Sequence, residues 1–248
     1  AFFVLLGLKI GPIYMNHSKV VNALSAVENM TDVETMSKRE ILISLNKRFS
    51  SNDLFAIGYS LGGNMLLKLL GECGTNTPLK SAVSVCAPLN LAICADTISQ
   101  GFSSFYEKKM LDNLKNTLLL KYEHHDMEKL ISLKKEDVQH IKTIREFDEV
   151  YTSRINGFGN ASNYYKLCSS KQFLKDIKIK TLLIHSKDDP FMTPEVLPNK
   201  EELSSFITLE VHKKGGHLGF IAGSILKPLY WLDNRIVSYI KNTPITNI

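Results

Sequence analysis

The sequence predicts an α/β fold in which a mostly parallel sheet is flanked by helices. The first observation is a short, wholly apolar run, Leu54–Ile57, which is typical of a buried strand covered on both faces. The second is a helix with an apolar stripe over Asn64–Glu72, followed by another strand-like run at Ser81–Ala87. A strand, a helix and a strand within about 35 residues form a βαβ unit, and such units build parallel sheets.

Further elements follow the same alternation. An amphipathic helix is expected over Ser37–Phe49, with Ser37 as its N-terminal cap. Two more strands are expected at Ile179–His185 and Phe206–Val211, and a last amphipathic helix over residues 228–241.

The pattern changes between about residues 90 and 170. This stretch shows helix-like segments, such as Phe105–Tyr122 and Val138–Tyr151, and no strand pattern. We therefore expect a helical insertion between two strands of the sheet.

Composition excludes several classes of function. Of the 248 residues, 44% are hydrophobic and 22% charged, as in globular proteins, and the net charge of +5 comes from scattered lysines. Because no basic stripe is visible, we expect no nucleic-acid partner. The apolar run Ala1–Leu8 is far shorter than the about 20 residues that cross a bilayer, and it lacks the features of a signal peptide.

Four cysteines are present, and none has zinc-ligand spacing or a C-x-x-C partner. We expect unbridged thiols and hence a reducing compartment, which favours a cytoplasmic protein. Phosphate-loop and dinucleotide-binding patterns are missing as well, so we expect no cofactor and no metal.

The segment Gly58–Gly62 reads G-x-S-x-G, with Ser60 at its centre. This pattern is typical of a nucleophile elbow when it follows an apolar strand and opens a helix, as it does here. A tight strand-to-helix turn strains the serine and needs small neighbours two positions away. It also exposes the hydroxyl and directs the backbone N–H of Leu61 to the place where an oxyanion would form.

A histidine and an acid follow in the chain order expected for this arrangement. His217 lies in a glycine-rich loop after the last strand, and Asp188 and Asp189 follow the strand that ends at His185. Either carboxylate could orient the histidine, although a solvated Asp-Pro turn is the alternative. Ser186 occupies the place of the usual glycine after the strand, and counting residues from it favours Asp189 as the acid that orients the histidine. Asp188 would then shape the loop.

Five segments together resemble the YheT-like branch of the α/β-hydrolases, to which several animal ABHD proteins also belong. They are Gly58–Asn64, Ile144–Asp148, Asn163–Tyr165, Asp188–Phe191 and Gly215–Phe220. The resemblance covers about residues 37–241. It implies an α/β-hydrolase fold, a single domain over residues 1–248 with a helical cap insertion at about 90–170, and a triad of Ser60, Asp189 and His217. It also implies hydrolysis of carboxylic esters, including lipid-like or short- and medium-chain acyl esters.

The chain departs from these relatives before the elbow, where they carry several more strands and a histidine–glycine oxyanion loop. We expect the N-terminal strands to be largely missing, with Phe2–Leu8 able to stand in for one of them beside Leu54–Ile57. On this expectation the domain is N-terminally truncated, and membrane association would require a missing N-terminal region. The alternative function is an inactive remnant or binding protein without a complete oxyanion hole.

Overall fold

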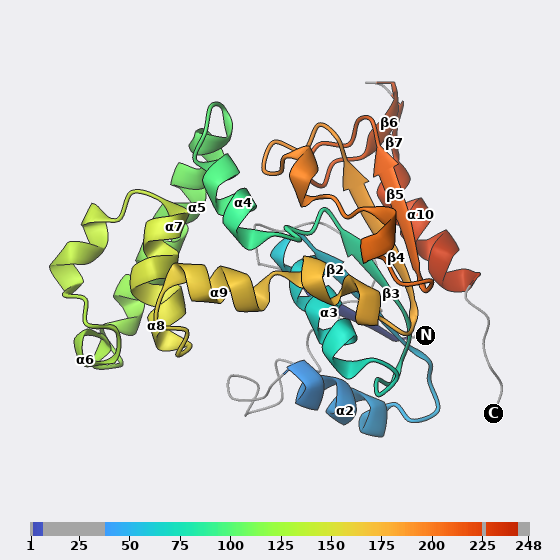
Figure 1. Ribbon diagram of the computed structural model, residues 1–248, viewed down its shortest axis with the longest axis horizontal. Helices are drawn as coiled ribbons and strands as arrows, with labels where there is room; N and C mark the ends of the chain where they lie inside the picture. The colour runs from blue at the N-terminus through green and yellow to red at the C-terminus, as the bar shows by residue number, and fades with distance from the viewer. Residues whose placement is uncertain (1, 7–37, 225–226, 243–248) are drawn as a thin grey trace. The chain divides into compact units, whose positions relative to one another are not determined.

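The computed structural model describes residues 2–6, 38–224 and 227–242 of the chain (Figure 1). The expected cap residue Ser37 lies outside these ranges. The chain divides into two compact units. Residues 1–89, 170–189 and 198–248 form the sheet unit, and residues 90–169 and 190–197 form the helical unit.

The sheet unit contains five parallel strands in the order β1-β2-β3-β4-β5. Their bounds are Phe2–Leu6, Leu54–Tyr59, Leu79–Val85, Lys180–Ser186 and Ile207–His212. The strands expected from the sequence are therefore present, with shifts of one or two residues at their ends. At one edge of the sheet, β1 pairs with β2, the strand that leads into the G-x-S-x-G segment. The apolar N-terminal run therefore forms a strand beside β2, as expected.

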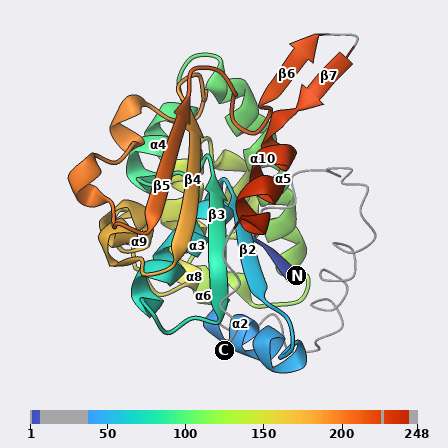
Figure 2. The same ribbon diagram turned by 90° about the vertical axis from the view of Figure 1, so that its right-hand side faces the viewer.

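Three helices flank this sheet: α2 (Lys38–Arg48), α3 (Leu61–Cys73) and α10 (Trp231–Lys241). Figure 2 shows α10 in front of the sheet and α3 behind it. The apolar stripe of α3 is buried against the strands, as the sequence pattern predicts. The core side chains with essentially no exposed surface include Leu54, Leu66, Leu67, Leu70, Leu182, Leu183 and Ile184.

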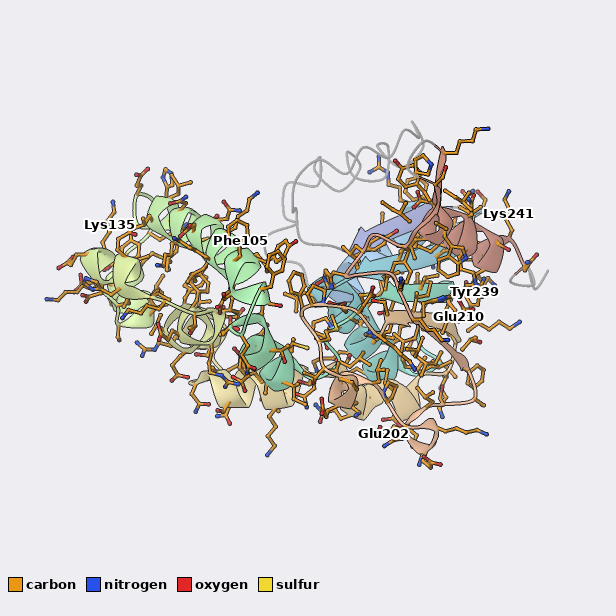
Figure 3. All side chains as sticks on the ribbon, turned by 90° about the horizontal axis from the view of Figure 1, so that it is seen from above. Phe105, Lys135, Glu202, Glu210, Tyr239 and Lys241 are labelled. Atoms are coloured by element: carbon orange, nitrogen blue, oxygen red, sulfur yellow. The ribbon has the colours of Figure 1, made fainter. Side chains whose placement is uncertain are left out.

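The last helix begins later than expected. Strands β6 (Ile221–Ser224) and β7 (Lys227–Tyr230) pair antiparallel, so residues 228–230 belong to a hairpin and α10 starts at Trp231. The prediction of a helix from residue 228 was wrong because strand pairing, which is not local in sequence, decides these residues. Within α10, Arg235 forms an ion pair with Glu210 of β5 and lies 5.7 Å from the ring centroid of Tyr239. Glu210 and Tyr239 are labelled in Figure 3.

Helix α3, which follows the elbow, packs against η3 (Ser170–Asp176). The buried Asn64 of α3 accepts a hydrogen bond from the backbone N–H of Ser170 at 2.8 Å. Farther along α3, a Cβ atom on Gly71 would lie 2.5 Å from the carbonyl oxygen of Phe173. The backbone of η3 therefore approaches α3 as closely as a glycine allows.

The helical unit is built from α4 to α9 with the short helices η1, η2 and η4. Their bounds are Leu91–Ile98, Ser103–Lys121, Met127–Ile131, Ile144–Phe147, Ser153–Ile155 and Ala161–Cys168 for the α-helices. For η1, η2 and η4 they are Lys135–His140, Asp148–Thr152 and Pro194–Val196. This unit has its own buried cluster, which consists of Leu111, Leu118, Met127, Ile131, Val138, Ile141 and Phe147.

The expected helical stretch Val138–Tyr151 is broken in the structure. Helix η1 ends at His140, and α7 begins at Ile144. The break arises because Thr143 caps a new helix, accepting a hydrogen bond from the backbone N–H of Glu146 at 3.1 Å.

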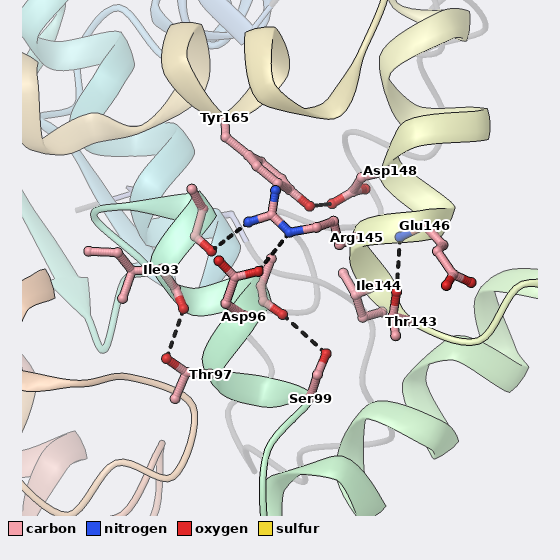
Figure 4. Close-up of polar contacts among 12 residues, drawn as sticks. Ile93, Asp96, Thr97, Ser99, Thr143, Ile144, Arg145, Glu146, Asp148 and Tyr165 are labelled. Carbon is pink, nitrogen blue, oxygen red and sulfur yellow. Dashed lines mark hydrogen bonds and ion pairs between the residues drawn. The ribbon is translucent and has the colours of Figure 1, made fainter.

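Arg145 joins several helices of this unit (Figure 4). Its guanidinium donates to Asp96 at 2.7 Å and to the carbonyl of Ala92 at 3.1 Å, and it stacks 5.0 Å from the ring centroid of Tyr165. The Tyr165 hydroxyl in turn donates to Asp148 at 2.8 Å, and burial raises the pKa of that carboxyl. Two of the segments that resemble YheT-like proteins thus meet in one network that holds the helical unit together.

All four cysteines lie in the described ranges and are present as thiols, in agreement with the sequence analysis. Among the helices described, none combines the length and the apolar character that a membrane span requires.

Replacing Gly71 with alanine tests the close packing of α3 on η3. The new methyl group would meet backbone atoms of Phe173, so we expect Gly71→Ala to lower the free energy of unfolding by about 1–3 kcal/mol. The neighbouring exposed substitution Glu72→Ala is expected to change it by less than about 0.5 kcal/mol. Urea denaturation followed by circular dichroism measures both, and equal effects would contradict the packing argument.

Candidate active site

Ser60 lies between β2 and α3 with φ 50° and ψ −126°. A positive φ is strained for a residue with a Cβ atom and costs on the order of 1–3 kcal/mol. The strained turn is held from both sides: Ser60 N–H donates to the carbonyl of Val85 in β3 at 2.9 Å, and its own carbonyl accepts from Gly63 and Asn64 of α3. The sharp strand-to-helix turn expected from the sequence is present.

The glycine two residues before Ser60 is required by this turn. A Cβ atom on Gly58 would lie 2.6 Å from both the carbonyl oxygen of Gly62 and the Cα of Gly63. Gly63 is constrained as well, since its Cβ would lie 2.6 Å from the hydroxyl of Ser84 in β3. Only glycines at these places allow α3 to start directly above the strand ends.

Leu61 is the first residue of α3. The first backbone N–H groups of a helix have no partner within the helix, and the helix dipole makes this end favourable for negative charge. The N–H of Leu61 is therefore a suitable donor to an oxyanion formed next to Ser60.

Ser60, His217 and Asp189 form a continuous chain of hydrogen bonds. His217 Nε2 lies 2.9 Å from Ser60 Oγ, and its Nδ1 lies 2.8 Å from Asp189 Oδ2. The Asp189 side chain is 1% exposed and that of His217 is 15% exposed. A proton on Nδ1, shared with the buried carboxylate, leaves Nε2 free to accept the serine proton. All three residues belong to the sheet unit.

The neighbouring acid, Asp188, has a different place. It is exposed, and its Oδ1 accepts hydrogen bonds from the backbone N–H groups of Gly216 and Gly215, each at 2.9 Å. These N–H groups, Gly216 first, lower the pKa of the Asp188 carboxyl. Of the two acids considered from the sequence, Asp189 contacts the histidine, and Asp188 holds the loop that carries it.

The far end of the His217 loop is anchored by aromatic rings. Phe220 is buried and stacks on Trp231 with ring centroids 5.8 Å apart, and His212 lies edge-on to Trp231 at 4.3 Å. A Cβ atom on Gly215 would lie 2.6 Å from the Phe220 ring, so the loop folds tightly over it. Asp188 at one end and this cluster at the other fix the position of His217.

Two residues near the site were not given a role by the sequence analysis. The side chain of His185 is buried in β4. Burial lowers its pKa to about 4, with the Asp189 carboxylate opposing and His217 adding to the effect. Cys86, assigned to the apolar strand, instead follows β3 with φ 45° and is buried beside Asp189.

Among the described residues, one group of three side chains could offer metal ligands: Cys86, Asp189 and His217, whose ligand atoms lie within 4.8 Å of one another. Coordination there would have to break the hydrogen bond between His217 and Asp189, which is intact. The geometry therefore fits proton transfer better than metal binding.

Comparison with known proteins identifies the family of the chain. Residues 45–224 match the model described as "alpha/beta hydrolase fold". The chain belongs to the α/β-hydrolase family. A second model, of a domain of unknown function (DUF4845), matches residues 9–58, most of which lie outside the described ranges.

This α/β hydrolase is YheT-like, as the sequence resemblance indicates. It is 38% identical over 207 residues to the putative esterase YheT of Escherichia coli, covering 84% of this chain and 60% of that protein. It is 32% identical to the medium-chain fatty acid ethyl ester synthase/esterase 2 of Saccharomyces cerevisiae, covering 77% and 47%. It is 31% identical to the human monoacylglycerol lipase ABHD2, covering 79% and 49%. The chain thus spans 60% or less of the length of these relatives.

Solved structures show a more distant likeness. A Pyrococcus furiosus esterase, Pf2001, matches with a TM-score of 0.44 and 12% identity over 82% of this chain and 59% of the other. A monoacylglycerol lipase from Paleococcus ferrophilus matches with a TM-score of 0.42 and 17% identity over 82% and 72%.

Replacing His185 with leucine tests its burial as a neutral side chain. The imidazole of His185 takes up a proton below about pH 6.5 in the unfolded chain, but only below about pH 4 in the folded chain. The wild-type chain should therefore lose up to about 3 kcal/mol of unfolding free energy between these pH values that His185→Leu retains. Urea denaturation at both pH values measures the difference. The matched control is His140→Leu at an exposed histidine, and identical pH dependence in all three proteins would contradict the prediction.

Proposed function

We propose that this chain hydrolyses carboxylic esters through an acyl-enzyme intermediate formed on Ser60. The observation that carries the proposal is the chain of hydrogen bonds from Ser60 Oγ to His217 Nε2 and from His217 Nδ1 to Asp189, at 2.9 and 2.8 Å. It is supported by the strained φ of Ser60, which exposes a nucleophile at the start of a helix.

Each residue has a defined role in the proposed reaction. Ser60 Oγ attacks the ester carbonyl while His217 Nε2 takes the hydroxyl proton, and Asp189 stabilises the imidazolium that results. The N–H of Leu61 donates to the oxyanion of the tetrahedral intermediate. His217 then gives its proton to the departing alcohol.

Water completes the cycle. His217 takes a proton from a water molecule, the hydroxide attacks the acyl-enzyme, and the proton returns to Ser60 Oγ as the carboxylic acid leaves. All these proton transfers use protein groups and water.

The proposed substrate class is an ester with an apolar acyl chain. Relatives named as an esterase, a medium-chain fatty acid ethyl ester synthase/esterase and a monoacylglycerol lipase support this choice. In the helical unit, the side chains of Phe102, Phe105 and Tyr106 are 76%, 68% and 42% exposed. Tyr106 also meets Phe191 edge-on, with ring centroids 5.5 Å apart. The helical unit therefore exposes an aromatic surface of its own.

A series of p-nitrophenyl esters from acetate to dodecanoate tests the reaction and the substrate class together. We expect hydrolysis by the wild-type chain, higher kcat/KM for medium chains than for acetate, and near-background rates for Ser60→Ala. Folded wild-type protein that hydrolyses none of these esters faster than Ser60→Ala would contradict the proposal and favour a binding protein.

The two adjacent acids give a second test with a built-in control. Asp189→Asn removes the carboxylate from His217 and should lower kcat/KM roughly 10³- to 10⁴-fold. Asp188→Asn leaves that contact in place and weakens only the support of the loop backbone, so we expect a loss of roughly tenfold or less. Steady-state kinetics on the best ester compare them, and equal losses would contradict the assignment of Asp189.

A further inference from the structure

Cys86 is a second strained residue at the same edge of the sheet as Ser60. Tyr59 and Val85 are paired in the parallel strands β2 and β3, so Ser60 and Cys86 directly follow neighbouring strand ends. Cys86 has φ 45°, a conformation that glycine adopts without a Cβ penalty. A side chain is therefore held at this place at an energetic cost, and such strain clusters where a side chain has a function.

The strained backbone directs the thiol toward the acid of the proposed triad. Cys86 is 0% exposed, and its sulfur lies within 4.8 Å of ligand atoms of both Asp189 and His217. The thiol is placed to donate either to the carbonyl oxygen of Gly216, which lies 4.0 Å from the sulfur, or to the Asp189 carboxylate. The backbone N–H of Ser186 also hydrogen-bonds to the sulfur.

The surroundings keep this thiol protonated. Burial is the largest cause that raises the pKa of Cys86, followed by the negative charge of Asp189, with a smaller effect of Asp188 in the same direction. Among the residues that the structure describes, the other titratable groups facing this cluster are His217 and the buried His185. A protonated thiol is a hydrogen-bond donor, and donors are stronger in a site that excludes water.

We propose that Cys86 is a positioning residue for Asp189. Its S–H donates to the Asp189 carboxylate, holds it toward Nδ1 of His217 and offsets part of its negative charge. The proposal rests on the proposed ester hydrolysis, and it adds a fourth side chain to the machinery of that site.

Three substitutions at one position separate the donor from the packing. Cys86→Ser keeps a donor, Cys86→Ala removes it, and Cys86→Gly removes it while relieving the backbone strain. The control is Cys94→Ala, at another buried cysteine, in the helical unit.

The pH dependence of kcat/KM is the main measurement, because its acidic limb reports protonation of the base in the free enzyme. A carboxylate that loses a donor stabilises the imidazolium more strongly. In Cys86→Ala and Cys86→Gly we expect kcat/KM to fall roughly three- to tenfold and the acidic limb to move up by roughly half a pH unit. Cys86→Ser restores a donor, so its acidic limb should return to the wild-type position and its loss of kcat/KM should be smaller than that of Cys86→Ala. Cys94→Ala should stay within about twofold of wild type.

A readout without turnover keeps this test separate from that of the proposed function. The proton between His217 Nδ1 and Asp189 gives a low-field NMR signal, assigned by its loss in His217→Gln. It should move downfield in Cys86→Ala and stay in place in Cys86→Ser. An unmoved signal in folded Cys86→Ala overturns the positioning role even if the wild-type chain hydrolyses no ester. Unchanged pH profiles in all Cys86 variants of an active enzyme overturn it while leaving the proposed function standing.

Discussion

The site depends on the strained backbone of Ser60, which is held between the end of β2 and the start of α3 with φ 50°. The turn is possible because Gly58 has no Cβ atom, which would clash with the backbone of Gly62 and Gly63. The hydrogen bond from the Ser60 N–H to the Val85 carbonyl connects the turn to the next strand. Because β2 and β3 are buried and paired on both sides, the turn cannot relax without disturbing the centre of the sheet. The sheet thus supports a serine in a conformation that a free chain would avoid.

The partners of Ser60 reach it because parallel strands end at a common edge. Asp189 follows β4, and His217 is carried by the loop that follows β5. Each depends on supports of its own: the exposed Asp188 binds the start of the His217 loop, and the stack of Phe220 on Trp231 fixes its end. Cys86, placed after β3, belongs to the same edge. Every strand from β2 to β5 therefore contributes a residue to the site or the loop that bears one.

Local signals in the sequence were enough to predict the elbow, the strands of the parallel sheet and the two candidate acids. An apolar strand, the G-x-S-x-G segment and an apolar-striped helix occur in one stretch, and each restricts the backbone of the next. The two acids differ in the contacts that their side chains make, and those contacts depend on the glycine loop 28 residues further on. From the sequence, only the number of residues after the strand end could favour Asp189 over Asp188.

Features decided by distant contacts were missed. The hairpin of β6 and β7 has exposed strands of four residues each, too short and too mixed to show a period of two. The break before α7 depends on Thr143 acting as an N-terminal cap, and no local sequence pattern distinguishes this threonine from one inside a helix. Cys86 was assigned to an apolar strand because a positive φ in a residue other than glycine leaves no mark on the sequence.

Intact-mass detection of fluorophosphonate labelling tests most directly whether these residues act together as a nucleophilic site. The reagent forms a covalent adduct with a serine only when a base activates it. We expect one adduct on the folded wild-type chain, no adduct on Ser60→Ala and strongly slowed labelling of His217→Gln. A folded wild-type chain that gains no adduct, or an adduct that persists in Ser60→Ala, would contradict the role of Ser60 as an activated nucleophile.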